Sequence, residues 1–291
     1  VDIAGAGFIN FHLQPAAKLA IVHEILAQGD AFGRSTLGGK QKVQIEFVSA
    51  NPTGPLHVGH GRGAAYGASL ASLLAFAGWD VTREYYVNDA GRQMDILALS
   101  AWLRYLELCG EQVAFPPNAY QGDYVRAMAT AMKQTRGEAL LHKAADVLAD
   151  TPGLPEAGGS DDEAKQQHEA YLDALIANAK RLLGEEWQYV HNYVLTEQLD
   201  DCREDLAEFG VHYEVWFSEK ALFDAGLVER CVARLEAAGH IYLKNGAKWF
   251  RSTAFGDEKD RVVQRDNGLY TYFASDIAYH LNKYERGFDR M

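Results

Sequence analysis

Cysteine pairs and long apolar runs are both absent from this sequence. Its three cysteines, Cys109, Cys202 and Cys231, lie far apart, so a zinc or redox centre built on a C-x-x-C pair is excluded and single buried thiols are predicted. No apolar run reaches the roughly 18 residues of a membrane helix, and residues 1–13 lack the basic flank and cleavage pattern of a signal peptide. We therefore expect a cytoplasmic protein that makes no contact with a membrane.

Basic residues are also scarce, and the formal net charge is −12 over 291 residues. Nonspecific coating of nucleic acid relies on Lys and Arg that neutralise phosphates, so this class of binder is disfavoured. A local basic face is compatible with an acidic chain, and a nucleic-acid partner therefore stays open. With 48% hydrophobic residues, the chain has enough apolar material for a full core and for more than one domain.

Two strands that flank a glycine-bearing turn and a helix predict a parallel βαβ unit. Residues 43–48 are β-branched and aromatic, and they run directly into the turn chemistry of 51–55. A helix is predicted over 64–77 with Gly78 as its end, and a second strand follows over 80–87. The apolar stripe of this helix is predicted to consist of Leu70, Leu73, Leu74 and Ala77. The fold class is therefore α/β with a parallel sheet.

A long helical segment interrupts this pattern. From about Gln93 to His240 the apolar spacing is that of amphipathic helices, which predicts an insertion into the α/β unit. A surface loop rich in Pro and Gly is predicted at 151–160. The predicted helices of the insertion are 122–134, 138–149, 161–183, 197–209 and 219–238.

The two ends of the chain also carry local patterns. Residues 1–13 alternate like the last strand of a larger unit, and 14–28 has the apolar spacing of a helix. After the insertion, 241–250 predicts a hairpin around Asn245-Gly246, because that dipeptide tolerates the positive φ angles of a type I′ turn. Shorter strands are predicted at 262–264 and 269–272, and a final helix at 275–284.

The segment His57-Val-Gly-His60 lies beyond the first predicted strand, where open parallel sheets bind ligands. Gly59 lets a nucleotide approach the backbone without a Cβ in the way. His57 and His60, at i and i+3, lie on one face of the first helical turn and can donate hydrogen bonds to a triphosphate. Taken alone, the two histidines are equally compatible with a capping role or with an H-x-x-H metal pair.

The longer string from Ser49 to His60, SANPTGPLHVGH, resembles the first signature of class I aminoacyl-tRNA synthetases, and in particular the arginyl-tRNA synthetase family. The resemblance continues through 61–64 and 85–91 and reappears in 272–279. It implies a Rossmann-like (HUP-type) parallel-sheet catalytic core interrupted by a helical connective insertion. That architecture agrees with the order of strands and helices predicted from the residues themselves.

The resemblance also implies a division of the chain. Residues 1–28 correspond to the end of an N-terminal tRNA-binding domain and a connecting helix, and 29–108 to the first part of the catalytic domain. Residues 109–240 form the helical connective insertion, and 241–291 return to the catalytic domain. The family's second signature loop, of Lys-Met-Ser-Lys type, and its anticodon-binding domain match nothing here. We therefore expect a fragment that lacks the C-terminal part and that does not charge tRNA by itself.

The implied activity is ATP-dependent formation of arginyl-adenylate from L-arginine, followed by transfer to the 3′ end of tRNA(Arg), with Mg²⁺ assisting. The substrate carboxylate attacks the α-phosphate in line, so no covalent nucleophile is needed. The catalytic residues His57 and His60 fit stabilisation of phosphate charge better than proton transfer. The resemblance assigns ATP binding to His57, Gly59, His60 and Gly61. It implies no metal site made of protein side chains.

An arginine pocket needs planar acceptors, ideally carboxylates. Glu46 lies near the end of an otherwise apolar strand, where a solvated acid is not expected in a sheet covered on both faces. By resemblance, Glu46 and Asp276 flank the guanidinium, while Tyr272, one turn before Asp276, stacks on it. Ser49 and Asn51 match positions that hold the α-amino and carboxylate ends of the amino acid. Asn51 also has a competing interpretation as a turn former before Pro52, although the binding role is favoured.

Two other interpretations stay open at this point. A class I synthetase or ligase for another small acid would leave Glu46 and Asp276 without a cation partner, which disfavours it. A non-catalytic paralogue that serves as an interaction module would keep the fold. Intact His57 and His60 speak against such a module, although the missing second loop speaks for it. As partners we expect tRNA(Arg) and L-arginine, and we expect the protein to be a monomer.

Overall fold

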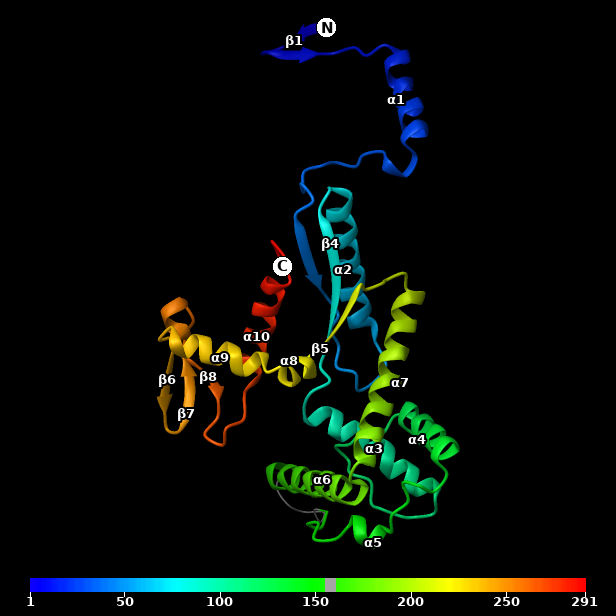
Figure 1. The fold of residues 1–291 in the computed structure, drawn as a ribbon. Coiled ribbons are helices and arrows are strands. Elements are labelled where there is room, and N and C mark those ends of the chain that lie inside the picture. The colour runs from blue at the N-terminus through cyan, green and yellow to red at the C-terminus, as the bar shows by residue number, and fades with distance from the viewer. Residues whose placement is uncertain (155–160) are drawn as a thin grey trace.

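A computed structural model describes residues 1–154 and 161–291, so most of the loop predicted at 151–160 lies outside the described residues. A small parallel sheet occupies the middle of the molecule (Figure 1). A bundle of helices lies at one end of this sheet, a unit with an antiparallel sheet lies beside it, and an N-terminal arm extends away from it. The arrangement places several chain segments around the central sheet.

The central sheet has the strand order β3-β4-β5, and both pairings are parallel. Its strands are β3 (Lys42–Glu46), β4 (Asp80–Val87) and β5 (Val215–Ser218). The first two strands and their parallel pairing confirm the prediction. The third strand was not predicted, because it lies within the segment expected to be helical.

Helix α2 (Val58–Phe76) connects β3 to β4 and starts earlier than predicted. The predicted apolar stripe is wrong, since Leu70 and Leu73 are 37% and 66% exposed. The buried residues of α2 are Ala64, Gly67 and Ala71. A Cβ at Gly67 would lie 2.2 Å from Cγ of Phe47, so α2 turns a face of small residues toward this ring. Close approach of the helix to the preceding loop therefore decides which face is buried.

The helical bundle has one apolar core, which includes the fully buried Trp102 and Tyr105. Its helices are α3 (Arg92–Leu108), α4 (Asp123–Arg136), α5 (Ala144–Val147), α6 (Asp161–Leu183) and α7 (Glu186–Glu208). The predictions for α4 and α6 are confirmed, whereas α7 begins at Glu186 rather than at 197.

The helix predicted over 138–149 is wrong except for the four residues of α5. The backbone before α5 makes hydrogen bonds to side chains of α3 instead. Trp102 Nε1 donates to the carbonyl of Leu140 (2.9 Å), and the Tyr105 hydroxyl accepts from the amide of Leu140 (3.3 Å). The same hydroxyl donates to the carbonyl of Gly137 (2.7 Å). Tertiary hydrogen bonds thus replace the helical ones that the local pattern favoured.

A second unit follows β5. Helices α8 (Lys220–Asp224) and α9 (Leu227–Ala237) replace the single helix predicted over 219–238. The break falls at Gly226, which adopts a left-handed φ of 64°. That conformation ends α8 and redirects the chain into α9.

The hairpin predicted around Asn245-Gly246 is confirmed. Strands β6 (Ile241–Lys244) and β7 (Ala247–Phe250) pair antiparallel, and Asn245 and Gly246 have φ angles of 51° and 79°. Strand β8 (Arg261–Gln264) pairs with β7 and agrees with the predicted piece at 262–264.

The last helix, α10 (Tyr272–Glu285), starts earlier than the predicted 275. The strand-like piece predicted at 269–272 is reduced to a bridge between Tyr270 and Gln264. The buried residues of α10 are Ala274, Ser275, Ala278, Tyr279 and Lys283. The three apolar ones, Ala274, Ala278 and Tyr279, join a core that also contains Tyr86 of β4. Helix α10 therefore ties the C-terminal unit to the central sheet (Figure 1).

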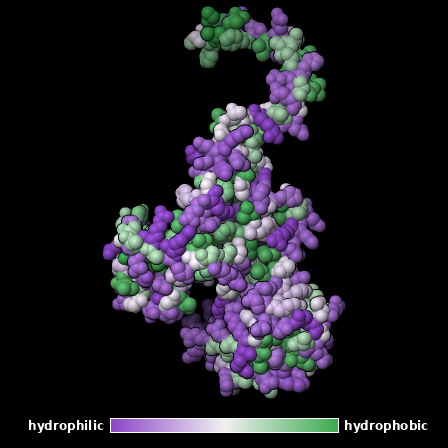
Figure 2. Space-filling model, viewed as in Figure 1, coloured by the Kyte–Doolittle hydropathy of each residue, from purple (hydrophilic) through white to green (hydrophobic). Residues whose placement is uncertain are grey.

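The N-terminal arm packs on little else in the chain. Strands β1 (Asp2–Ala4) and β2 (Phe8–Asn10) form a hairpin where a single strand was predicted. Helix α1 (Pro15–Gln28) is confirmed, and the short helix η1 (Gly29–Ala31) follows it. None of the residues of α1 is buried, and apolar side chains are visible along the arm in Figure 2. In residues 1–154 and 161–291, no helix is long and apolar enough to span a bilayer.

Candidate active site

The two histidines of the predicted nucleotide turn cap helix α2. His57 is the N-cap residue, and its Nδ1 accepts the amide N–H of Gly59 (3.1 Å). His60 Nδ1 accepts the amide N–H of His57 (3.2 Å), and the two rings stack with centroids 3.8 Å apart. With each Nδ1 used as an acceptor, the proton of each neutral ring resides on Nε2. The capping role therefore leaves an Nε2–H donor on each ring.

The protonation state of His60 follows from its surroundings. Burial and the neighbouring His57 ring both lower the pKa of His60. His60 is consequently neutral at pH 7, which agrees with its acceptor role at Nδ1. The neutral His60 ring can donate a hydrogen bond from Nε2 without adding a net charge to the turn.

Glycine at position 59 makes this arrangement possible. A Cβ there would lie 2.9 Å from Cε1 and 3.0 Å from Nδ1 of His57, closer than real Cβ atoms approach. Gly61 differs, because a Cβ there would meet nothing within 4 Å, and its amide bonds the carbonyl of His57 (3.0 Å). Gly59 is thus required for the histidine cap itself, a role that the sequence did not indicate.

Three tyrosine hydroxyls hold the loop that leads into the turn, and the sequence analysis missed all three contacts. Each donates to a backbone carbonyl: Tyr213 to Phe47 (3.1 Å), Tyr85 to Ala50 (3.1 Å) and Tyr124 to Thr53 (2.7 Å). Burial raises the pKa of Tyr124 to about 12 and raises the pKa values of the other two as well. The three hydroxyls therefore stay protonated donors at neutral pH.

The loop also contains two residues in the left-handed region. Val48 and Ser49 have φ angles of 66° and 44°, which a β-branched residue such as Val48 rarely adopts. This backbone lets Ser49 Oγ accept the amide N–H of Tyr86 (3.0 Å) on the neighbouring strand. The same hydroxyl donates to Glu46 Oε1 (3.4 Å). The strained conformation thus fixes Ser49 between β4 and Glu46.

Asn51 lies between the same loop and helix α3. Its side-chain Nδ2 donates to Oε1 of Gln93 (3.0 Å). The sequence analysis did not single out Gln93, although it directly follows the first residue of α3. The contact fixes the orientation of the Asn51 amide.

Glu46 is already paired in this structure. Lys283 Nζ of α10 lies 2.7 Å from Glu46 Oε2, and the Lys283 side chain is only 4% exposed, against 31% for Glu46. The ammonium also lies over the ring of Tyr279, 4.1 Å from its centroid. The sequence analysis missed Lys283, although its position about two helical turns after Asp276 on the same helix could have indicated it.

A second, fully buried carboxylate lies behind this pair. Glu84 of β4 is 0% exposed and accepts a hydrogen bond from the Tyr279 hydroxyl. The guanidinium of Arg286 donates to both oxygens of Glu84. Glu84 is one of three charged residues in the strand 80–87, so the sequence alone did not distinguish it as buried.

Asp276 and Tyr272 occupy different surroundings on α10. Asp276 is exposed as a residue, although its carboxyl is partly desolvated. This desolvation raises the pKa of Asp276, the nearby charge of Glu46 raises it further, and His280 has the opposing effect. The structure thus brings Glu46, Ser49 and Asp276 to one place. Tyr272 is 79% exposed and lines a separate cavity of about 490 Å³ with Glu219 and Arg265.

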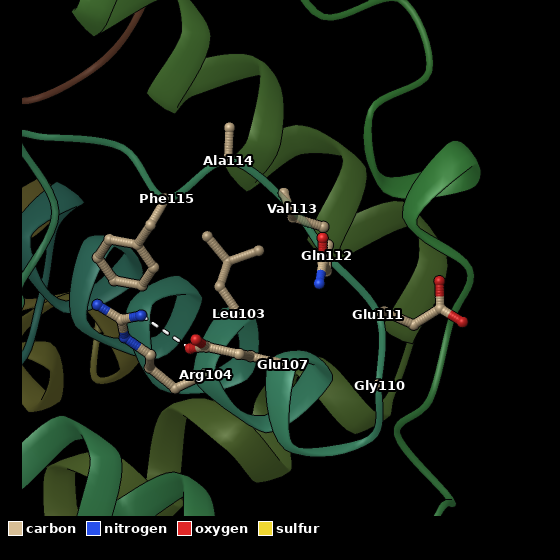
Figure 3. A pocket seen from close by; sticks show the side chains of 9 residues that line it. All are labelled: Leu103, Arg104, Glu107, Gly110, Glu111, Gln112, Val113, Ala114 and Phe115. Atoms are coloured by element: carbon tan, nitrogen blue, oxygen red, sulfur yellow. Dashed lines mark hydrogen bonds and ion pairs between the residues drawn. The ribbon is translucent and has the colours of Figure 1, made fainter.

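Two further cavities are lined in part by residues of the bundle. One of about 340 Å³ is bounded by the turn and by α4, and it includes Asn51, His60 and Tyr124. The other, of about 540 Å³, lies within the helical bundle and contains none of the predicted site residues (Figure 3). There the Arg104 guanidinium pairs with Glu107 (2.8 Å) and stacks on the ring of Phe115, as Figure 3 shows.

The class of protein follows from two features of the fold. The first strand of the parallel sheet leads into a histidine-capped helix, and a helical bundle lies between the second and third strands. The sequence profile described as "tRNA synthetases class I (R), catalytic domain" matches residues 21–118. The fold is that of a class I aminoacyl-tRNA synthetase catalytic core.

Within that class, the chain belongs to the arginyl-tRNA synthetase family. It is 72% identical to "Arginine--tRNA ligase" of Dechloromonas aromatica over 290 residues and 71% identical to that of an Azoarcus species over 293 residues. Both comparisons cover 100% of this chain and 49% of the relative. The chain thus spans about half the length of the curated relatives it matches.

Solved structures give the same result. An arginyl-tRNA synthetase structure from Campylobacter jejuni superposes with a TM-score of 0.75 at 27% identity, covering 95% of this chain and 52% of that one. The Thermus thermophilus arginyl-tRNA synthetase superposes with a TM-score of 0.55 at 25% identity, covering 95% of this chain and 40% of that one.

Proposed function

We propose that the protein carrying this sequence is an arginine--tRNA ligase of the cytoplasm. It activates L-arginine with ATP to arginyl-adenylate and transfers the arginine to the 3′ end of tRNA(Arg). The observation that carries the proposal is the cluster at the end of β3, where Glu46 and Asp276 lie near a histidine-capped turn. The names of the relatives, which cover the whole of this chain, support it.

The turn acts on ATP. The Nε2–H groups of His57 and His60 donate to phosphate oxygens, where negative charge increases as the arginine carboxylate attacks the α-phosphate and pyrophosphate leaves. Their rings are held before substrate arrives, because each Nδ1 bonds a backbone amide. Gly59 and Gly61 keep the backbone at the start of α2 free of side chains. Catalysis then depends on fixed donors and requires no protein nucleophile.

The carboxylates recognise the side chain of arginine. Glu46 and Asp276 offer planar acceptors for a guanidinium. Ser49 and Asn51 face the α-amino and carboxylate end of the amino acid, and their side chains are oriented by Tyr86 and Gln93. Tyr272 is free to move onto the guanidinium, because its side chain is 79% exposed.

In the proposed reaction, Mg²⁺ is bound only to the ATP substrate. Among the described residues, no group of three or more His, Cys, Asp or Glu side chains is placed to hold a metal. Mg²⁺ commonly binds through substrate phosphates and water, so the nucleotide is taken as magnesium-ATP. No step proposed here depends on the ion.

The division of the chain into domains and its partner also follow from the same proposal. We assign residues 1–28 to the end of a tRNA-binding domain, 29–108 and 241–291 to the catalytic domain, and 109–240 to the connective insertion. The protein acts on tRNA(Arg) as a monomer.

Arginine-dependent exchange between ATP and pyrophosphate tests the activity. The assay is run on the protein carrying this sequence, with and without tRNA(Arg). Lysine and citrulline are each tested in place of arginine. We expect exchange with arginine alone, since citrulline lacks the positive charge that two carboxylates require. Exchange that depends on a different amino acid would contradict the proposal.

A further inference from the structure

Lys283 is a nearly buried cation inside the proposed arginine pocket. Its side chain is 4% exposed, and its ammonium lies 2.7 Å from Glu46 Oε2. A buried ammonium is costly unless it is paired and hydrogen-bonded, so this lysine depends on Glu46. Glu46 in turn is the acid assigned to the substrate guanidinium. One carboxylate therefore serves both an internal cation and the substrate.

The position of Lys283 is fixed from behind. Its ammonium lies over the ring of Tyr279 at 4.1 Å. The hydroxyl of Tyr279 donates to the fully buried Glu84, and Arg286 bonds both oxygens of Glu84. Because these groups are packed between β4 and α10, Lys283 approaches Glu46 from one defined side.

The two oxygens of Glu46 are not equivalent. Oε2 accepts from Lys283 at 2.7 Å, whereas the Ser49 hydroxyl contacts Oε1 at a longer 3.4 Å. The long contact leaves Oε1 as the oxygen with hydrogen-bonding capacity to spare. A guanidinium that approaches from the side of Asp276 can use it.

The charges in the cluster also balance. Glu46 and Asp276 together carry two negative charges when ionised, and Lys283 supplies one positive charge. One net negative charge is left, which a single guanidinium neutralises. Two carboxylates without a cation would hinder each other's ionisation, and the pKa of Asp276 is already raised by burial and by Glu46.

We propose that Lys283 is a positioning residue for arginine. It holds one oxygen of Glu46 and leaves the cluster with one net negative charge, which the guanidinium of arginine neutralises. This inference rests on the proposed function, because it assigns the guanidinium of arginine to Glu46 and Asp276. It adds a third side chain that determines the affinity and its pH dependence.

Other titratable groups face the cluster from each element packed against it. Glu84 lies on β4 behind Tyr279, and His280 and Arg286 lie on α10 itself. Glu219, before α8, and Tyr86 of β4 interact with Asp276. All of them are present in every variant below, so differences between variants report on Lys283.

The test is calorimetric titration of L-arginine into the protein carrying this sequence, between pH 6 and pH 8. The variants are Lys283→Met, which keeps the length without the charge, and Lys283→Arg, which keeps the charge. Lys248→Met is the matched control, because Lys248 pairs with Glu236 at the same 2.7 Å in the C-terminal unit. Circular dichroism and thermal melting of each variant establish that it is folded.

Loss of the internal cation removes a positive charge that favours the ionised form of a neighbouring acid. We therefore expect Lys283→Met to bind arginine more weakly at pH 6, by at most the roughly tenfold that a pKa rise of about one unit allows. Its affinity should recover to within about threefold of wild type at pH 8, where the acids ionise without help. Lys283→Arg and Lys248→Met should follow the wild-type profile.

Three outcomes would contradict the inference in distinguishable ways. A Lys283→Met profile parallel to wild type at every pH would assign Lys283 a structural role alone. A large loss in Lys283→Arg would show that shape matters and charge does not, a result independent of whether Lys283→Met folds. Absence of arginine binding by the wild type would overturn the proposed function together with this inference.

Discussion

The hydroxyl of Tyr124 donates a 2.7 Å hydrogen bond to the carbonyl of Thr53. This bond joins α4 of the helical bundle to the loop that leads into the histidine turn. Since the same loop is held at Phe47 and Ala50 by two other tyrosines, its position is determined at three points. The bundle thus helps to place the turn proposed to bind the nucleotide.

Removing this contact tests the coupling. Tyr124→Phe should slow arginine-dependent pyrophosphate exchange about threefold to tenfold, because a hydrogen bond of this kind contributes about 0.5 to 1.5 kcal/mol. The control is Tyr171→Phe, which removes a similar bond to the carbonyl of Ala114 (2.9 Å) inside the bundle. Both variants should lose similar stability to urea, and only the first should lose activity. Equal activity in the two variants would exclude the coupling.

The histidines should affect the rate more than the affinity. His57→Ala and His60→Ala should each lower the single-turnover rate of adenylate formation about 100-fold to 1000-fold, as removal of one fixed donor to a developing charge does. Arginine affinity, measured by titration, should change little. His57→Asn separates the two roles, since asparagine caps a helix but lacks the imidazole. Near-normal rates in all three variants would rule out the role.

The cap depends on glycine at position 59. Gly59→Ala should displace the His57 ring, because a Cβ would lie 2.9 Å from its Cε1. We expect a loss of exchange activity of at least about tenfold, in line with a misplaced donor. Gly63→Ala is the matched control in the same helix, since a Cβ there meets nothing within 4 Å. That control variant should keep its exchange activity. Its free energy of unfolding should rise by up to about 1 kcal/mol, because alanine has the higher helix propensity.

The buried carboxylate behind Lys283 should govern stability. Arg286→Met leaves Glu84 charged and 0% exposed, and loss of one partner of a buried pair costs about 3 to 5 kcal/mol. Urea denaturation measures the loss. The double variant Glu84→Gln with Arg286→Met should recover part of it, because no unpaired charge is left.

A surface pair supplies the comparison for Glu84 and Arg286. Arg230 pairs with Glu285, and both side chains are more than 40% exposed. Arg230→Met should therefore cost at most about 1 kcal/mol. A loss of equal size in the two arginine variants would mean that burial of Glu84 contributes nothing.

Local patterns in the sequence predicted those elements whose conformation is decided locally. Strands β3 and β4, helix α6 and the Asn245-Gly246 hairpin follow from side-chain type and turn chemistry alone. Strand β5 was missed because four residues carry no clear period, and they become a strand only by pairing with β4. The helix predicted over 138–149 failed because Trp102 and Tyr105 bind its backbone.

The candidate site was predictable to the extent that it lies in one motif. Ser49, Asn51, His57 and His60 belong to a single string, and Asp276 belongs to a second. Lys283 was missed because its partner Glu46 is 237 positions away, and its spacing from Asp276 on α10 was the one local indication. The tyrosines that hold the loop act in the same way, since Tyr213 bonds a carbonyl 166 positions away.

The helical bundle occupies the connection between β4 and its parallel neighbour β5, so the chain leaves the sheet at Val87 and rejoins it at Val215. Glu46 and Asp276 do not depend on the length of that connection, because β4 itself positions the loop through Tyr85 and α10 through Glu84. Helices within the bundle could therefore be lengthened, shortened or exchanged between homologues without altering the spacing of the two acids. The sheet would tolerate variation in the bundle as long as Tyr124 still reached Thr53.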